Sequence, residues 1–188
     1  PFLVETSVKS REITVHARVE NAAVPDGSRF ECEITRDGKP VKKFSAPLGK
    51  GISNAAVSAP WKDAELWDIG KPVLYSTTVT LLGPAGKALD RSLPERFGFR
   101  EFEVRGRFFY LNGVKINLKP CAYYVQRPTW LSKEVIGRWF SRIVRDGHNF
   151  VYTETVDKPG CPEGLEDVLD EADERGVLMA ITPTMINE

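Results

Sequence analysis

Residues 67–113 read WDIGKPVLYSTTVTLLGPAGKALDRSLPERFGFREFEVRGRFFYLNG, and this stretch decides the fold. Residues 73–82 alternate between two faces and are rich in β-branched and aromatic side chains, which is typical of a strand packed on at least one side. Pro84-Ala85-Gly86 supplies the turn chemistry after that strand. A second strand is predicted over residues 97–104, and it leads to Asn112-Gly113, a pair that strongly favours a tight hairpin.

The residues before this stretch predict an all-β domain. Two sequences with turn chemistry, Pro25-Asp26-Gly27 and Asp37-Gly38, separate short runs of alternating polarity. Strands that follow one another at intervals of roughly 8–12 residues are typical of a β-sandwich. The predicted strands cover residues 2–8, 13–19, 29–35, 41–44 and 55–59.

After residue 113 the hydrophobic period changes from two to that of a helix. Ser132 is predicted to cap a helix whose apolar residues recur at spacings of three and four, and Gly147 ends it. An uninterrupted apolar run at residues 177–181 is typical of a strand in a parallel sheet. The sequence therefore predicts a right-handed βαβαβ unit, which is the architecture of the opening of a barrel. Its strands and helices are expected at residues 114–118, 132–147, 149–155, 163–176 and 177–181.

Composition excludes several classes of partner. The chain has 26 basic and 26 acidic residues and no long basic run, so we expect neither a nucleic-acid nor a membrane partner. No apolar run approaches the roughly 20 residues of a membrane span. The first ten residues are not a signal peptide, so localisation stays open, with a periplasmic or secreted parent compatible. Cys32, Cys121 and Cys161 lack the spacing of metal ligands, and no metal or cofactor is expected.

Four segments in order carry a resemblance to a known family. Trp67-Asp68, the Pro-Val-Leu-Tyr of residues 72–75, the Phe-Gly-Phe-Arg of residues 97–100 and the Leu-Asn-Gly of residues 111–113 resemble glycoside hydrolase family 2. That family contains β-galactosidases, β-mannosidases and β-glucuronidases. The resemblance implies a fold that is mainly β plus α/β, an immunoglobulin-like β-sandwich followed by a partial (β/α)8 barrel. We expect the sandwich at residues 1–106 and the first strands and helices of a truncated barrel at residues 107–188.

The same resemblance implies a reaction. Family members hydrolyse β-glycosidic bonds with retention, which requires two carboxyl groups about 5–5.5 Å apart. The catalytic Glu pair is expected on later barrel strands, beyond residue 188. Asn187-Glu188 is similar to the Asn-Glu pair of the family, but it follows the third predicted barrel strand instead of the fourth. We therefore expect no catalytic residue within the chain, with Glu188 as the one candidate, and a carbohydrate as the substrate of the parent enzyme.

Three positions depart from the family where its side chains reach the sugar. Tyr152 stands at the position of an Arg, Thr155 at that of a His, and Tyr124 at that of a second His. All three follow or end predicted barrel strands, on the face that carries catalysis in such barrels. They are the candidates for substrate binding, and they argue against the usual exo-β-galactosidase or β-glucuronidase specificity. Two alternatives follow, a parent that binds an unusual sugar and a parent that is catalytically degenerate.

A second function class is a non-catalytic sandwich that binds carbohydrate or another protein. Trp61 and Trp67 could stack on sugar rings, but we favour the interpretation that both plug the ends of the sandwich core. The βαβαβ tail favours the hydrolase fragment, since a free-standing binding module has no use for open parallel strands. Those strands also predict self-association through residues 114–188. The aromatic residues considered for this class are Trp61, Trp67, Tyr123, Tyr124 and Trp130.

Two groups of titratable residues are interpreted as structural. The acidic residues of the second predicted helix form a charge run, which is typical of a solvated helix face. His148, at the start of a strand, is interpreted as structural instead of as a base, and His16 as an outward residue of its strand. The acidic residues are Asp167, Asp170, Glu171, Asp173 and Glu174.

Overall fold

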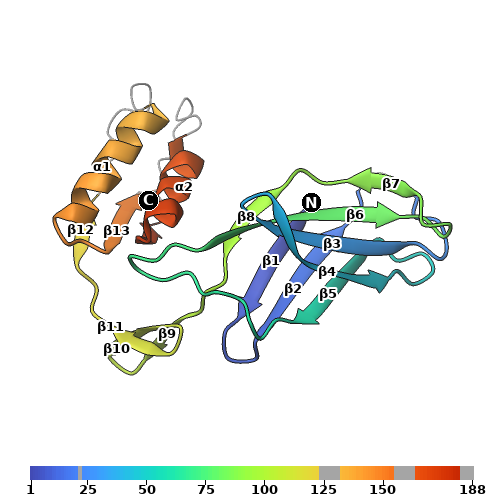
Figure 1. Ribbon diagram of the computed structural model, residues 1–188, viewed down its shortest axis with the longest axis horizontal. Helices are drawn as coiled ribbons and strands as arrows, with labels where there is room; N and C mark the ends of the chain where they lie inside the picture. The colour runs from blue at the N-terminus through green and yellow to red at the C-terminus, as the bar shows by residue number, and fades with distance from the viewer. Residues whose placement is uncertain (21–22, 123–131, 155–163, 183–188) are drawn as a thin grey trace, which may run out of the picture. The chain divides into compact units, whose positions relative to one another are not determined.

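The computed structural model describes residues 1–20, 23–122, 132–154 and 164–182 (Figure 1). The chain forms two compact units, and each is built from more than one stretch of sequence. The first unit contains Pro1–Leu66 and Leu74–Phe102. The second contains Trp67–Val73 and Glu103–Glu188. The short stretch Trp67–Val73 thus interrupts the first unit in sequence and belongs to the second in structure.

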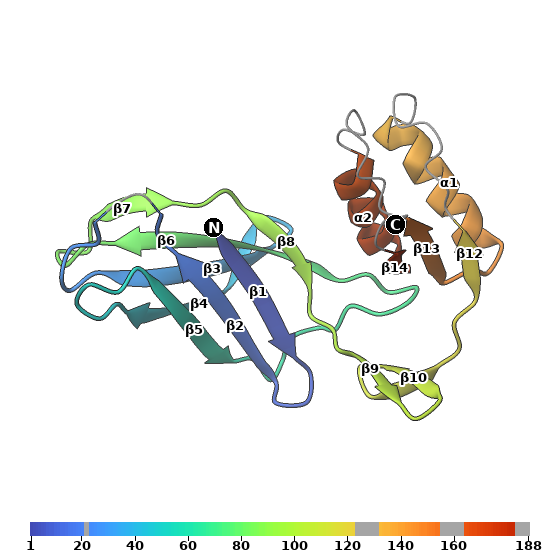
Figure 2. The same cartoon turned by 180° about the vertical axis from the view of Figure 1, so that it is seen from behind.

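The first unit is a β-sandwich of two antiparallel sheets, as the alternating runs predict (Figures 1 and 2). One sheet has the order β1-β2-β5 and the other the order β4-β3-β6-β7, with β8 pairing with β6. The strands are β1 (Phe2–Ser7), β2 (Glu12–Arg18), β3 (Arg29–Arg36), β4 (Lys39–Pro47), β5 (Asn54–Pro60), β6 (Leu74–Leu82), β7 (Ala88–Arg91) and β8 (Glu95–Gly98).

The sandwich core follows from the period of two. Every second residue of β2 and β3 is buried, because successive side chains of a strand point to opposite faces. His16 lies on the outer face of β2, as predicted, with its Nε2 3.0 Å from Oε2 of Glu5. The buried cluster consists of Val15, Ala17, Phe30, Cys32, Leu48, Val57, Val79 and Leu81.

Aromatic rings pack together elsewhere in this unit. Trp61 is 5% exposed, and its ring centroid lies 4.8 Å from that of Tyr75 and 5.7 Å from that of Phe99, edge-on. The Tyr75 hydroxyl accepts a hydrogen bond from the backbone N–H of Glu65 at 2.9 Å. This packing confirms that Trp61 is a core residue, because its ring has no free face toward solvent.

The predicted strand over residues 97–104 is wrong as a single strand. β8 ends at Gly98, and the next strand is β9 (Phe102–Arg105), most of which belongs to the second unit, since that unit resumes at Glu103. The residues between them bond to the end of β1 and not to the β6 ladder. The Thr6 hydroxyl donates to the Arg100 carbonyl at 3.0 Å, and the backbone N–H groups of Val8 and Lys9 donate to Oε2 of Glu101.

After Trp67–Val73, the second unit continues with a small antiparallel sheet. Its order is β11-β10-β9, with β10 at Phe108–Leu111 and β11 at Val114–Ile116. Asn112 and Gly113 have φ values of 53° and 80°, the positive pair that a two-residue hairpin turn requires, so the predicted hairpin is confirmed.

That hairpin corrects the prediction for residues 114–118. They were expected to form the first strand of the βαβαβ unit, but β11 pairs antiparallel with β10. The physical reason is the turn itself, since a two-residue turn returns the chain beside the strand it has just left. The first strand of the parallel sheet is instead β12 (Pro120–Ala122).

The parallel sheet has the order β12-β13-β14 and alternates with two helices (Figure 1). These elements are α1 (Lys133–Arg145), β13 (Phe150–Glu154), α2 (Gly164–Arg175) and β14 (Leu178–Thr182). Their shared core contains Ile136, Phe140, Ile143, Val151, Val168, Ala172 and Val177, from both helices, β13 and the residue before β14. Neither helix in the described part of the chain is long and apolar enough to cross a membrane.

Helix α1 begins and ends near the predicted residues. Ser132 has extended backbone angles and occupies the N-cap position, although its side chain makes no capping hydrogen bond. At the other end, Gly147 has a φ of 88°, and the N–H of His148 donates to the Ile143 carbonyl at 2.9 Å. Glycine is favoured at this position because a side chain is disfavoured at positive φ.

Candidate functional site

The carboxyl ends of the three parallel strands form the candidate site. β12, β13 and β14 run in the same direction, so Ala122, Glu154 and Thr182 end at the same edge of the sheet. In α/β architectures, ligands bind at this edge. The register places Tyr152 beside Ala122 on one neighbouring strand and Ala180 on the other.

The two faces of this sheet have different surroundings. Cys121, Val151 and Met179 are in register across the three strands, and all three belong to or pack against the core with the helices. Because side chains alternate along a strand, Tyr152 points to the opposite face. Tyr152 is 39% exposed, whereas its neighbour Thr153 is buried. Helices α1 and α2 therefore cover one face of the sheet, and Tyr152 lies on the other.

Of the four candidate residues that the sequence indicates, the described part of the chain contains Tyr152. Its position in β13, two residues before the end of the strand, agrees with the predicted strand at residues 149–155. Tyr124, Thr155 and Glu188 lie outside the described residues, as do Tyr123, Trp130 and Cys161. The grouping of the candidates at one strand edge is therefore still a prediction.

Trp61 and Trp67 do not form a sugar-stacking surface. Trp67 is fully buried, with 0% exposure, and Trp61 is 5% exposed. The interpretation of Trp67 as a plug of the sandwich core is corrected, because Trp67 belongs to the second unit and its indole N–H donates to the Asp173 carbonyl at 2.8 Å. No local pattern in the sequence indicates a bond between residues 106 positions apart.

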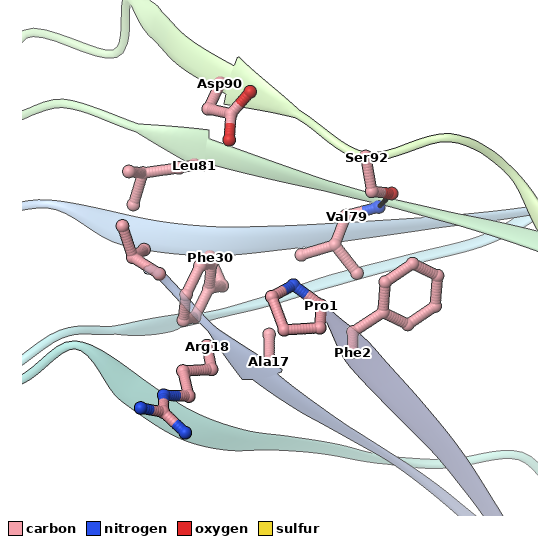
Figure 3. A pocket seen from close by; sticks show the side chains of 10 residues that line it. Pro1, Phe2, Ala17, Arg18, Phe30, Val79, Leu81, Asp90 and Ser92 are labelled. Carbon is pink, nitrogen blue, oxygen red and sulfur yellow. Dashed lines mark hydrogen bonds between the residues drawn. The ribbon is translucent and has the colours of Figure 1, made fainter. Parts of the chain in front are cut away.

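The sandwich contains a pocket of about 90 Å³ between its two sheets (Figure 3). Its walls are mainly apolar, with Arg18 and Asp90 as the charged side chains that line it. A pocket for a small molecule typically has a volume of about 300–1,000 Å³, so this space is too small for a sugar ring with its hydroxyl groups. It also offers one carboxylate where a retaining mechanism requires two. The lining residues are Pro1, Phe2, Ala17, Arg18, Val19, Phe30, Val79, Leu81, Asp90 and Ser92.

Two residues of the sandwich, Cys32 and Tyr75, have shifted pKa values with structural causes. Burial raises the pKa of Cys32 to about 12, with a smaller contribution from the charge of Glu31. Burial also raises the pKa of Tyr75, whose hydroxyl is bonded to the backbone of Glu65. A thiol that keeps its proton is a poor nucleophile, so Cys32 is a packing residue. Within the described ranges, no group of three or more His, Cys, Asp or Glu side chains could hold a metal ion.

The acidic face of α2 is corrected at one position. Glu171 was expected to be solvated, but it is 5% exposed and forms an ion pair with Arg175, one helical turn later. The side-chain oxygen of Ser141 on α1 accepts a hydrogen bond from Nε of Arg175 at 3.1 Å. The signal available in the sequence was the Glu-x-x-x-Arg spacing, which places both side chains on the same side of a helix.

His148 lies away from the candidate site at the carboxyl ends of the parallel strands, so it does not provide a base there. It precedes β13, at the end of the sheet where the strand begins, and its Nδ1 is buried without a hydrogen-bond partner among the described residues. In folds with a parallel sheet, ligands bind at the opposite end, where the carboxyl ends of the strands lie. The position therefore supports the structural interpretation of His148.

Comparison with solved structures shows the fold over nearly the whole chain. The β-glucuronidase 3 of Bacteroides uniformis, in its apo form, is 22% identical with a TM-score of 0.69, and the match covers 96% of this chain and 22% of that one. The β-glucuronidase of Parabacteroides merdae is 21% identical with a TM-score of 0.66, over 95% of this chain and 22% of that one. The β-glucuronidase of Ruminococcus gnavus, in complex with a C6-substituted uronic isofagomine, is 17% identical with a TM-score of 0.71, over 97% and 29%.

The chain thus spans between 22% and 29% of the length of these structures. No curated protein matches the chain at a significant level. The family model for glycosyl hydrolases family 2 matches residues 2–100, which is more than half of the 188 residues. With the sandwich in place over the same residues, the chain belongs to glycoside hydrolase family 2.

Proposed function

We propose that this chain is the immunoglobulin-like sandwich and the opening of a (β/α)8 barrel of a larger enzyme that hydrolyses β-glycosidic bonds with retention. The observation that carries the proposal is the extent of the structural likeness. The family match ends at residue 100, whereas the likeness to the three β-glucuronidases covers at least 95% of the chain. The likeness therefore includes the parallel sheet and its helices.

The parallel sheet supports the barrel in this proposal. Strands β12, β13 and β14 are adjacent in sequence order, and a helix follows each of the first two. In a (β/α)8 barrel every strand is followed by a helix, and the helices form an outer ring. The face of Tyr152 would then line the inside of the barrel, and the face of Val151 the outside.

The catalytic chemistry would use residues outside this chain. Retaining hydrolysis uses one carboxyl group as acid and base and a second, about 5–5.5 Å away, as nucleophile. We place this Glu pair on later barrel strands, beyond residue 188, and favour a loop role for Glu188. Tyr152, at the strand edge, would contact the sugar together with Tyr124 and Thr155.

The burial of the two Trp rings weakens the alternative of a non-catalytic binding module. That function would use exposed aromatic rings, and Trp61 and Trp67 are both buried. The three other aromatic residues considered for it lie outside the described residues. The hydrolase fragment is thus the function that the described residues support best.

The test compares two proteins. Residues 1–188 and the product of the complete reading frame that contains them are assayed on p-nitrophenyl β-galactoside, β-mannoside, β-glucuronide and β-glucoside. We expect turnover by the complete product alone, and the preferred sugar names the specificity. In that product, Tyr152→Phe should raise KM if the hydroxyl binds the sugar, with Tyr110→Phe as the control. Turnover by residues 1–188 alone would refute the proposal and direct attention to Glu188. Silence from both proteins would favour a catalytically degenerate barrel or the binding module.

A further inference from the structure

Residues 67–73, which we call the clasp, belong to the second unit although the sequence places them between two sandwich strands. β5 ends at Pro60 and β6 begins at Leu74, and both lie in the first unit. A loop between sandwich strands is expected to lie on the surface, where its backbone polar groups meet water. Trp67 is instead fully buried in the second unit. The burial of Trp67, in a loop that is expected to be exposed, must therefore come from specific contacts in the second unit.

Hydrogen bonds hold the clasp on two sides. The indole N–H of Trp67 donates to the carbonyl of Asp173 in α2 at 2.8 Å. The carbonyl of the same residue accepts a hydrogen bond from Nδ2 of Asn112, in the hairpin turn between β10 and β11, at 2.9 Å. Within the clasp, Asp68 and Lys71 exchange two backbone hydrogen bonds of 3.0 Å, which close it into a tight turn.

Gly176 receives the clasp at the end of α2. Its φ is 68°, and a Cβ placed there would lie 2.7 Å from the backbone nitrogen of Gly70 and 3.0 Å from the carbonyl oxygen of Asp68. These are backbone atoms, so no rotamer change can relieve such a contact. The backbone of the clasp therefore lies against the α2–β14 turn at a distance that only glycine permits.

The same turn sets where β14 begins. The N–H of Val177 donates to the Ala172 carbonyl at 2.9 Å, and the N–H of Leu178 donates to the Asn149 carbonyl at 3.0 Å. The second of these bonds joins the start of β14 to the residue before β13. Any movement of Gly176 would thus disturb the first bond of the parallel ladder.

We propose that the clasp is an integral part of the second unit and fixes the α2–β14 turn, so that the second unit is incomplete without a segment that the chain supplies between β5 and β6. A polypeptide that begins after the sandwich would lack the side chain that fills this site and the carbonyl that pairs with Asn112. The inference stands on the contacts of the clasp and does not depend on the proposed function.

Hydrogen exchange of residues 1–188, followed by mass spectrometry, tests the proposal with two matched variants. Trp67→Phe keeps a ring but removes the N–H that bonds to Asp173. Trp61→Phe removes an indole that is also buried, in the sandwich. Since one hydrogen bond and part of a buried ring are lost, we expect about tenfold faster exchange in α2 and β14 for Trp67→Phe. Trp61→Phe should accelerate exchange in β6 and leave α2 and β14 unchanged.

A second variant tests the other hydrogen bond of Trp67, in case Trp67→Phe does not fold. Asn112→Asp preserves side-chain size and tolerates positive φ, but it places an oxygen opposite the Trp67 carbonyl. It should also accelerate exchange in the clasp and in α2. Unchanged exchange of α2 and β14 in both variants, or acceleration confined to the sandwich, would overturn the proposal.

Discussion

The packing at Gly176 makes a prediction that two substitutions can separate. Gly147 and Gly176 end the two helices, and both have positive φ, 88° and 68°. No atom lies within 4 Å of a Cβ built on Gly147, whereas one on Gly176 would meet backbone atoms at 2.7 Å and 3.0 Å. Alanine at the two positions therefore has the same conformational cost and a different steric cost.

The magnitudes follow from these distances. Alanine in the left-handed region costs roughly 1–2 kcal/mol, so Gly147→Ala should lower the free energy of unfolding by about that amount. Gly176→Ala has the same cost plus that of displacing the clasp. Forcing extra atoms into a packed site costs typically about 1–3 kcal/mol. We therefore expect Gly176→Ala to lower the free energy of unfolding by roughly 2–5 kcal/mol in total.

Urea unfolding monitored by circular dichroism at a helix band measures both variants, because α1 and α2 report on the second unit. Tryptophan fluorescence provides a second probe, to which Trp67 contributes as one of four tryptophans. Gly176→Ala should unfold at a clearly lower urea concentration than Gly147→Ala. Equal midpoints would refute the reasoning, since they would show that the clasp yields without cost or does not lie against Gly176.

Three further predictions concern other parts of the chain. A Cβ on Gly137 would lie 2.9 Å from Nη2 of Arg175 and 3.0 Å from Oε2 of Glu171, the ends of two side chains that can turn away, and alanine favours helix by about 1 kcal/mol over glycine. Gly137→Ala should therefore lower the free energy of unfolding by less than Gly176→Ala does, and an equal loss in urea unfolding would contradict this. Burial raises the pKa of Cys32 from 9.0 to about 12, so between these values the unfolded chain loses a proton that the folded chain keeps. The free energy of unfolding should fall as pH rises through this range, and Cys32→Ala should make the fall shallower in urea titrations from about pH 8 to about pH 11. Finally, the open parallel sheet predicts concentration-dependent self-association through residues 114–188 in sedimentation analysis, and limited proteolysis that cut the sandwich first would count against it.

The local sequence pattern was sufficient to predict elements whose residue spacing repeats along the chain or whose turn is fixed by two adjacent residues. The alternation of β2 and β3 predicted which residues are buried, and the spacing of apolar residues predicted α1 to within a residue at its start. Asn112-Gly113 predicted its hairpin because few residues tolerate two consecutive positive φ values. In each case the information lies within a few neighbouring positions.

The same local pattern gave wrong predictions where contacts with other parts of the chain determine which strand a segment joins. Residues 99–101 have the alternation of a strand, but their polar groups bond to the end of β1. Residues 114–116 have strand character too, and the turn before them decides which partner they take. Strand character alone does not identify a partner, since the pattern of a strand does not show which strand lies beside it.

Only part of the candidate site could be predicted from the sequence. Tyr152 was placed near the end of a strand from hydrophobic pattern and from resemblance, and the structure puts it in β13, on the face opposite Val151. Which face the helices cover was not in the pattern, because β13 begins with three consecutive aromatic or aliphatic residues, Phe150–Tyr152, and so shows no period of two. The core formed by α1, α2 and β13 decides it.

The sequence by itself determined the family, the sandwich and the helix–strand–helix–strand order after residue 132, because turn chemistry and hydrophobic period are properties of adjacent residues. Only the tertiary structure decided the position of Trp67. As a sequence, residues 67–73 are a loop between two sandwich strands, and as a structure they complete the second unit. The physical reason is that the site for Trp67 is built from Asp173 and Asn112, which lie 106 and 45 residues away in sequence and meet only in the folded chain.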